Sequence, residues 1–340
     1  MKDSGLIIST TSVEEEVEDS LDSVGEIEWR KWVVSEALHG SRLDRALAEL
    51  VPEFSRSYLQ QLIESGAVLQ GERPLTKPAM KVRAGDIGLI ELRPTPQSQA
   101  FKPESMELES VFVDEHLRVI NKPAGLVVHP APGNWSGTLL NGLLALDPKA
   151  ISLPRAGIVH RLDKDTSGLM VIARTRQVMD ALVHLIAERE VSRQYVALAH
   201  RPWAGPKARE VEEAIGRDPR NRLRMAVVNL EHQHGKTAKT RFELIENADK
   251  GCWLRCILFT GRTHQIRVHA AHIGHPLVSD DVYGGSAAAA MSRQALHADR
   301  LAFKHPVTGE AMAFNAPLPA DMRLALENWG LGYNGNKWDL

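Results

Sequence analysis

The sequence predicts an α+β protein, with a mainly antiparallel mixed sheet flanked by helices and a smaller domain in front. From about residue 105 to 328, strand-like runs form hairpins, without the regular strand–helix alternation of a doubly wound fold. Residues 94–104 contain proline and glutamine without an apolar period, which is typical of a linker. A chain of 340 residues is also long for one hydrophobic core.

The segment before the linker divides in two. Residues 1–28 are acidic and poor in aromatic residues, so we expect a disordered tail. Residues 30–93 should form a compact domain with two short helices and a little sheet. The helices follow from two apolar stripes at helical spacing: Leu43, Leu47 and Leu50, then Leu59, Leu62 and Ile63.

Periodicity places the elements of the larger domain, residues 105–328, in order. Two strands joined by a turn are expected within 108–123, then a helix within 137–147 and a buried strand at 168–174. These are followed by an amphipathic helix within 178–190, strands at 192–200 and 252–259, a short helix within 264–274 and a hairpin within 296–317.

Charge is distributed unevenly along the chain. Residues 1–28 carry a net charge of −8, whereas the remaining 312 residues carry +6. A basic body suits a polyanionic ligand, although it fits other functions too. No apolar run approaches the roughly 18 residues of a membrane helix, and the first residues lack a signal-peptide pattern, so we expect a cytoplasmic protein that does not use a membrane.

A histidine cluster suggests one alternative, a metal hydrolase. His264, His269, His272 and His275 lie within twelve residues, and Asp163 could add a carboxylate ligand. The zincin spacing is absent, however, and the charges of Arg262 and Arg267 would repel a cation. The chain also has neither a Walker loop nor a GxGxxG turn, so ATP and NAD are not implied.

Two stretches favour RNA chemistry. The stretch 216–225 contains four arginines: Arg217, Arg220, Arg222 and Arg224. Their guanidinium groups suit phosphate contacts, although a salt-bridged surface loop would have the same composition. In "HRLDKDTSGLMVIART", residues 160–175, Asp163 should sit at the mouth of the buried strand. An aspartate in a turn usually only stabilises the turn, but an aspartate beside a buried arginine stays ionised and can act as a nucleophile. Arg161 and Arg267 are the candidates for that arginine.

This stretch closely resembles the signature motif of the RluA-type RNA pseudouridine synthases. Three further segments, 119–144, 192–200 and 261–285, are similar to other motifs of that family, and residues 42–92 resemble its S4-like RNA-binding module. The resemblance runs from about residue 40 to 325. It implies the pseudouridine synthase fold, isomerisation of uridine without a metal or other cofactor, and structured RNA as the partner.

The resemblance also implies roles for individual residues. Asp163 would be the catalytic nucleophile, Tyr195 the aromatic that stacks on the target base, and Arg267 the partner that keeps Asp163 charged. Arg161 would contact the RNA beside the nucleophile. We also place His160, the four arginines of 216–225, and Arg56 of the S4-like module on the RNA.

The most similar family members act on 23S rRNA, so we expect that substrate and a monomeric enzyme, with other rRNA or tRNA uridines as the alternative. An RNA-binding module without catalysis is a further alternative, which the retained Asp163, Tyr195 and Arg267 argue against. Local departures from the family pattern at His200, Ser279 and Asp281 concern RNA preference more than activity.

Overall fold

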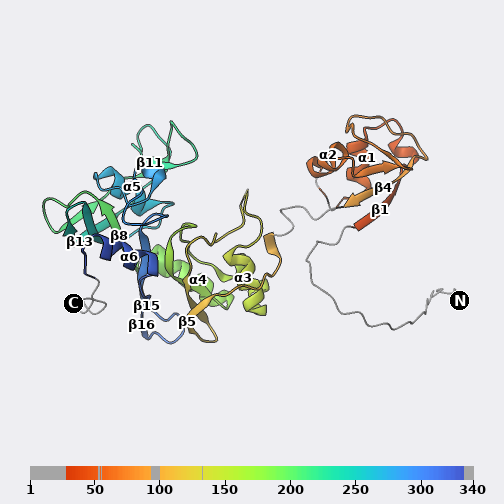
Figure 1. The fold of residues 1–340 in the computed structure, drawn as a ribbon. Helices are drawn as coiled ribbons and strands as arrows, with labels where there is room; N and C mark the ends of the chain where they lie inside the picture. Colours follow the sequence, from red (N-terminus) through yellow and green to blue (C-terminus); the bar gives the residue numbers. More distant parts are fainter. Residues whose placement is uncertain (1–27, 53, 55, 93–99, 132, 333–340) are drawn as a thin grey trace, which may run out of the picture. The chain divides into compact units, whose positions relative to one another are not determined.

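The computed structural model describes residues 28–52, 54, 56–92, 100–131 and 133–332. The predicted acidic tail lies outside the described residues except for its last residue, as do residues 94–99 of the predicted linker. The chain separates into two compact units, with the boundary between residues 95 and 96 (Figure 1). Among the described residues, no helix combines the length and apolar character needed to cross a bilayer.

The first unit packs two helices on a small antiparallel sheet with strand order β1-β4-β2-β3. Leu43, Leu47, Leu59 and Ile63 are completely buried, so the apolar stripes do form its core. Its elements are β1 (Glu28–Val33), η1 (Glu36–Leu38), α1 (Leu43–Leu50), α2 (Arg56–Glu64), β2 (Val68–Gln70), β3 (Arg73–Pro74) and β4 (Ile87–Leu92).

The second unit is built on a nine-stranded mixed sheet with the order β5-β6-β7-β15-β8-β14-β13-β9, in which β16 pairs with β15. Its strands are β5 (Glu109–Val113), β6 (Leu117–Lys122), β7 (Ser167–Ala173), β8 (Ser192–His200), β9 (Ala208–Val211), β13 (Thr240–Ala248), β14 (Gly251–Leu258), β15 (Leu296–Lys304) and β16 (Ala311–Asn315). A separate small sheet has the order β11-β10-β12, from β10 (Ile215–Arg217), β11 (Met225–Val227) and β12 (Gly235–Lys236).

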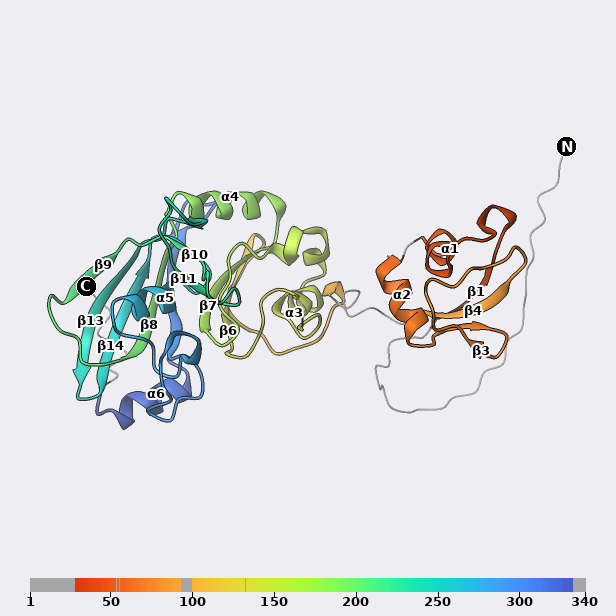
Figure 2. The ribbon, with the colours of Figure 1, turned by 90° about the horizontal axis from the view of Figure 1, so that it is seen from above.

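Helices cover both faces of the large sheet (Figures 1 and 2). Helices α3 (Leu139–Leu146) and α5 (Gln265–His272) share one apolar cluster with alternate residues of β7, β8 and β14. Helices α4 (Arg176–Ala187) and α6 (Ala320–Asn328) pack against the alternate residues on the other face. The short helices η3 (Pro148–Ser152), η4 (Pro154–Gly157) and η5 (Asp281–Tyr283) lie in the connections. The predicted α+β class is confirmed.

Strand β7 is held at the centre of this arrangement. All seven of its residues are buried, as expected for a strand covered by helices on both faces. It pairs in parallel with β15, with Ser167 opposite His297 and Gly168 opposite Ala298. Gly168 has φ +118°, and a Cβ there would lie 2.2 Å from the carbonyl oxygen of Ala298, so only glycine lets the strands approach. The turn before β7 is therefore fixed to a rigid core.

Candidate active site

A cleft of about 660 Å³ opens on the second unit, where the turn before β7, the start of β8 and the start of α5 meet. Its lining includes a single carboxylate, that of Asp163, and six arginines: Arg155, Arg161, Arg189, Arg193, Arg262 and Arg267. Such a wall concentrates positive potential in a concave site, which attracts a polyanion. The residues expected from the sequence to carry the chemistry, Asp163, Tyr195 and Arg267, all line it.

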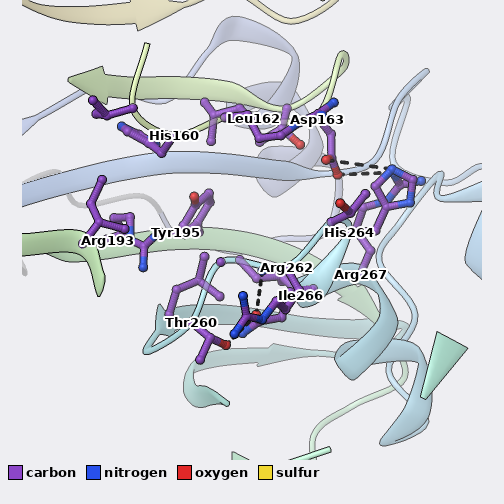
Figure 3. Close-up of a pocket in the computed structure, with 18 of the residues that line it drawn as sticks. His160, Leu162, Asp163, Arg193, Tyr195, Thr260, Arg262, His264, Ile266 and Arg267 are labelled. Atoms are coloured by element: carbon purple, nitrogen blue, oxygen red, sulfur yellow. Dashed lines mark hydrogen bonds and ion pairs between the residues drawn. The ribbon is translucent and has the colours of Figure 1, made fainter. Parts of the chain in front are cut away.

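Asp163 and Arg267 face one another in the cleft (Figure 3). Nη1 of Arg267 donates to Oδ2 of Asp163 over 3.3 Å. The arginine is only 6% exposed, whereas the Asp163 side chain remains 17% exposed and open to the cleft. One oxygen of a negatively charged carboxylate is thus tied to a buried cation while the group stays accessible, which suits a nucleophile.

Asp280, which the sequence analysis did not single out, holds Arg267 in place. Its two carboxylate oxygens accept from Nε and Nη2 of Arg267 over 2.7 and 2.8 Å, and its side chain is completely buried. Burial opposes the charged form of Arg267, but the hydrogen bonds and charge of Asp280, with Asp163, outweigh it and raise the pKa of Arg267. Since Asp280 binds two of the three guanidinium nitrogens, the guanidinium plane is fixed and the remaining nitrogen, Nη1, points at Asp163.

His264 and Tyr283 form a second contact with the carboxylate. Nε2 of His264 lies 3.9 Å from Oδ1 of Asp163, and Nδ1 lies 2.8 Å from the Tyr283 hydroxyl. That hydroxyl also accepts from the backbone N–H of Met225, and its hydrogen bond with Nδ1 leaves Nε2 of the imidazole facing Asp163. Burial lowers the pKa of His264 despite the attraction of Asp163. The Tyr283 ring also covers the guanidinium of Arg267, with its centroid 5.0 Å from Cζ.

Tyr195 projects from β8 into the same cleft and is 6% exposed (Figure 3). Burial raises the pKa of its hydroxyl to about 12, so the group is protonated at neutral pH. Cys256 pairs opposite it on β14, and both cysteines of the chain are buried free thiols. The ring is therefore a neutral, rigid aromatic surface beside the carboxylate.

Lys122 anchors the turn that carries Asp163. It is completely buried, and its Nζ donates to the carbonyl oxygens of Pro123, Leu126 and Lys164 over 2.7, 2.9 and 3.0 Å. Lys164 directly follows Asp163, so one of these bonds fixes the backbone beside the carboxylate. Burial lowers the pKa of Lys122 to about 7, although nearby carboxylates oppose the shift. Sequence periodicity gave no signal for this role.

Between pH 7 and 10 the wild-type protein should gain stability relative to Lys122→Met. The pKa of Lys122 is about 7 in the folded state, against an ordinary value of 10.5. Between these values the unfolded chain binds more protons, so the free energy of unfolding rises with pH; below both values the contribution is constant. Urea unfolding of both proteins at pH 6, 8 and 10 measures this difference. A difference that falls with pH would contradict the assignment.

The residues expected on the RNA differ in their surroundings. Arg161 is exposed at the cleft. His160 lines the cleft too, but its Nε2 accepts from the backbone N–H of Val171 over 3.0 Å, and burial lowers its pKa to about 3. It is a neutral group with one ring nitrogen committed to β7. Arg56, on α2, forms an ion pair of 2.9 Å with the buried carboxylate of Asp44 and is half-exposed.

The four arginines of 216–225 lie at the end of β10, which Arg217 closes, and on the loop that leads from there to β11. Arg217, Arg220 and Arg222 are exposed. Arg224 differs, because its Nε donates to Asp218 over 2.6 Å. This loop connects to the site, since Met225 at its end donates to Tyr283. Three of the four guanidinium groups are thus open to a ligand, and the fourth shapes the loop.

The histidine cluster disperses in the fold. His269 contacts Thr240 and the carbonyl oxygen of Glu213, while His275 bonds the carbonyl oxygen of His200 and stacks on Trp203. Only His264 reaches Asp163 among these. Within the described part of the chain, no three His, Cys, Asp or Glu side chains gather in a way that could hold a metal ion. The metal-hydrolase alternative thus has no structural support there.

Comparisons with known proteins agree with the resemblance inferred from the sequence. Residues 116–272 match the RNA pseudouridylate synthase family, and residues 41–87 match the S4 domain. The chain is 47% identical over 298 residues to ribosomal large subunit pseudouridine synthase D of Neisseria meningitidis serogroup B, covering 84% of this chain and 78% of the relative. It is 44% identical over 304 residues to the enzyme of the same name from Escherichia coli K12, covering 85% and 90%.

A solved structure, human RNA pseudouridylate synthase domain containing 1, is 26% identical with a TM-score of 0.51, covering 64% of this chain and 86% of that one. All residues that line the cleft except Leu296 lie within residues 116–272, which match the family. On this sequence and structural similarity, the chain belongs to the RNA pseudouridylate synthase family: it is a pseudouridine synthase, an isomerase, with an S4 RNA-binding domain before its catalytic domain.

Proposed function

We propose that this enzyme converts specific uridines of 23S rRNA into pseudouridine in the cytoplasm, acting as a monomer with Asp163 as the nucleophile. The substrate proposal is supported by relatives named ribosomal large subunit pseudouridine synthase D, of which the chain covers 78% or more. The single observation that carries the catalytic proposal is the accessible carboxylate of Asp163, fixed by Arg267 in an arginine-lined cleft.

The reaction requires the target nucleotide to leave its stack before it can reach this carboxylate. Extrusion costs a few kcal/mol, which contacts to the flipped base and its backbone must offset. The neutral ring of Tyr195 offers a stacking surface for the uracil, and Arg161, exposed beside Asp163, offers a phosphate contact. Arg217, Arg220 and Arg222 extend the basic surface.

The chemistry then needs a nucleophile and a proton acceptor. Asp163 attacks either C6 of the uracil or C1′ of the ribose, and the bond between N1 and C1′ breaks. The freed uracil turns so that C5 forms the new bond to C1′, and the proton on C5 is released. Because the hydroxyl of Tyr195 is protonated at neutral pH, it can relay that proton towards water only by exchanging its own.

Mapping pseudouridines in rRNA and tRNA from cells with and without the enzyme tests the substrate proposal. We expect sites in 23S rRNA to disappear with the enzyme and to return when the purified protein is added to unmodified RNA. Loss confined to tRNA or 16S rRNA would overturn the choice of substrate while leaving the reaction in place. Loss of no site would overturn the catalytic proposal itself.

Deleting residues 1–93 should weaken binding to substrate RNA about ten- to a hundredfold, because linked binding modules raise each other's effective concentration. The conversion rate at saturating RNA should change little, since the described cleft lies wholly in the second unit. Filter binding and single-turnover assays measure the two quantities. Deleting only the acidic residues 1–27 is the matched control and should not weaken binding. Unchanged affinity after the larger deletion would count against the S4 domain as an RNA anchor.

A further inference from the structure

Arg193 is a buried charge for which the described part of the protein supplies no counter-ion. It is 6% exposed and lines the cleft. Its Nε has no hydrogen-bond partner among the described residues, and the ion pairs found there do not include it. Arg267, equally buried, has two carboxylate partners instead. Of the two buried arginines of the cleft, Arg267 is therefore compensated by the described residues and Arg193 is not.

Such a group is costly unless it has a ligand. Burying an unpaired cation is far less favourable than burying an apolar side chain of similar volume. The guanidinium lies close to the loop that contains Gly261: a Cβ at that position would lie 2.8 Å from Nη1 of Arg193 and would push the side chain aside. His160, also beside Arg193 in Figure 3, is neutral and supplies no negative charge. An anion from outside the protein would compensate Arg193.

The position of Arg193 identifies the anion. Arg193 and Tyr195 are two residues apart on β8, so they face the same side about 7 Å apart along the strand. Figure 3 shows Arg193, Tyr195 and Asp163 in that order along the cleft. A uracil on Tyr195 would place its own sugar–phosphate within reach of Arg193. A uracil carbonyl would accept a hydrogen bond but would leave the charge uncompensated.

We propose that Arg193 binds the phosphate directly 5′ or 3′ of the target uridine, forming a subsite for the backbone of the flipped nucleotide. This rests on the proposed stacking of the base on Tyr195. The uracil would therefore stack on Tyr195 while the neighbouring phosphate binds Arg193, so one nucleotide makes both contacts. Before RNA binds, the guanidinium of Arg193 has no partner of opposite charge among the described residues and is available to the phosphate.

Neutral methylphosphonate linkages in the RNA test the contact. The full-length enzyme and its Arg193→Met and Arg193→Lys variants are compared on an RNA fragment that the wild type converts, with one phosphate at a time replaced. Arg193→Met should weaken binding about ten- to a hundredfold, and Arg193→Lys less. One methylphosphonate next to the target should weaken wild-type binding similarly and Arg193→Met no further. Arg209→Gln, an exposed arginine on the edge strand β9, is the control and should behave as wild type.

Stability without RNA separates a ligand contact from a structural one. Arg193→Met should unfold at the same temperature as wild type or higher, because it removes a buried unpaired charge. A lower unfolding temperature, or methylphosphonate effects that simply add to the mutation, would overturn the proposal. Conversion by the wild type is read in the same assays, so failure of the proposed reaction would show separately from failure of this contact.

Discussion

Asp163→Asn should reduce pseudouridine formation to background, a loss of at least roughly 10⁴-fold in the single-turnover rate. The amide keeps the shape of the side chain but has neither the charge nor the nucleophilic oxygen that the reaction requires. Arg267 keeps both of its contacts to Asp280, so the fold should survive. Conversion of a saturating excess of enzyme over RNA, with binding measured in parallel, tests the prediction.

The matched control for this variant is Asp165→Asn, in the same turn. The backbone oxygen of Asp165 accepts a hydrogen bond from Arg293, and its side chain takes no part in the contact between Asp163 and Arg267. The substitution should therefore leave most of the activity. RNA binding should persist in both variants. Substantial conversion by Asp163→Asn would show that another group forms the covalent bond.

Asp280→Asn should have the second large effect. It removes the charge that compensates the buried guanidinium of Arg267, and breaking a buried ion pair costs about 3–5 kcal/mol of stability. Activity should fall as well, because Arg267 is no longer held with one donor on Asp163. Urea unfolding and single-turnover rates well below the unfolding transition separate the two effects.

Asp281→Asn controls for this prediction at the adjacent position. Asp281 is exposed, so its substitution should change stability by no more than about 0.5 kcal/mol and leave the rate near wild type. Equal behaviour of the two variants would contradict the role assigned to Asp280.

The elements nearest the site could be predicted because their patterns are local. The strand expected at 192–200 is β8 with the same bounds, and the apolar run after Asp163 is the fully buried β7. The helix carrying Arg267 was expected within 264–274 and spans Gln265–His272. In contrast, β13 mixes polar and apolar residues around an irregularity in its pairing, and it was not anticipated.

The partners of the site residues could not be predicted, because they are set by distant pairing. The sequence "SDDVYGG" offers two adjacent acids, and only the fold selects Asp280 for Arg267 and leaves Asp281 exposed. Arg193 occupies an ordinary polar position in a strand, and what distinguishes it is burial with no partner for its Nε among the residues that the structure describes. Tyr283 and His264 likewise acquire their contacts from loops 19 residues apart.

The place of β15 in the sheet has a consequence for how the enzyme is made. The strand that follows Asp163 and the strand that carries Tyr195 are not neighbours; β15, which ends at Lys304, lies between them. During synthesis, the chain can pair β5, β6 and β7 early, but β7 and β8 are joined only after β15 has left the ribosome exit tunnel. A nascent chain is therefore catalytically incomplete until β15 has emerged as far as Lys304, so it cannot modify RNA of the ribosome that is producing it before that point.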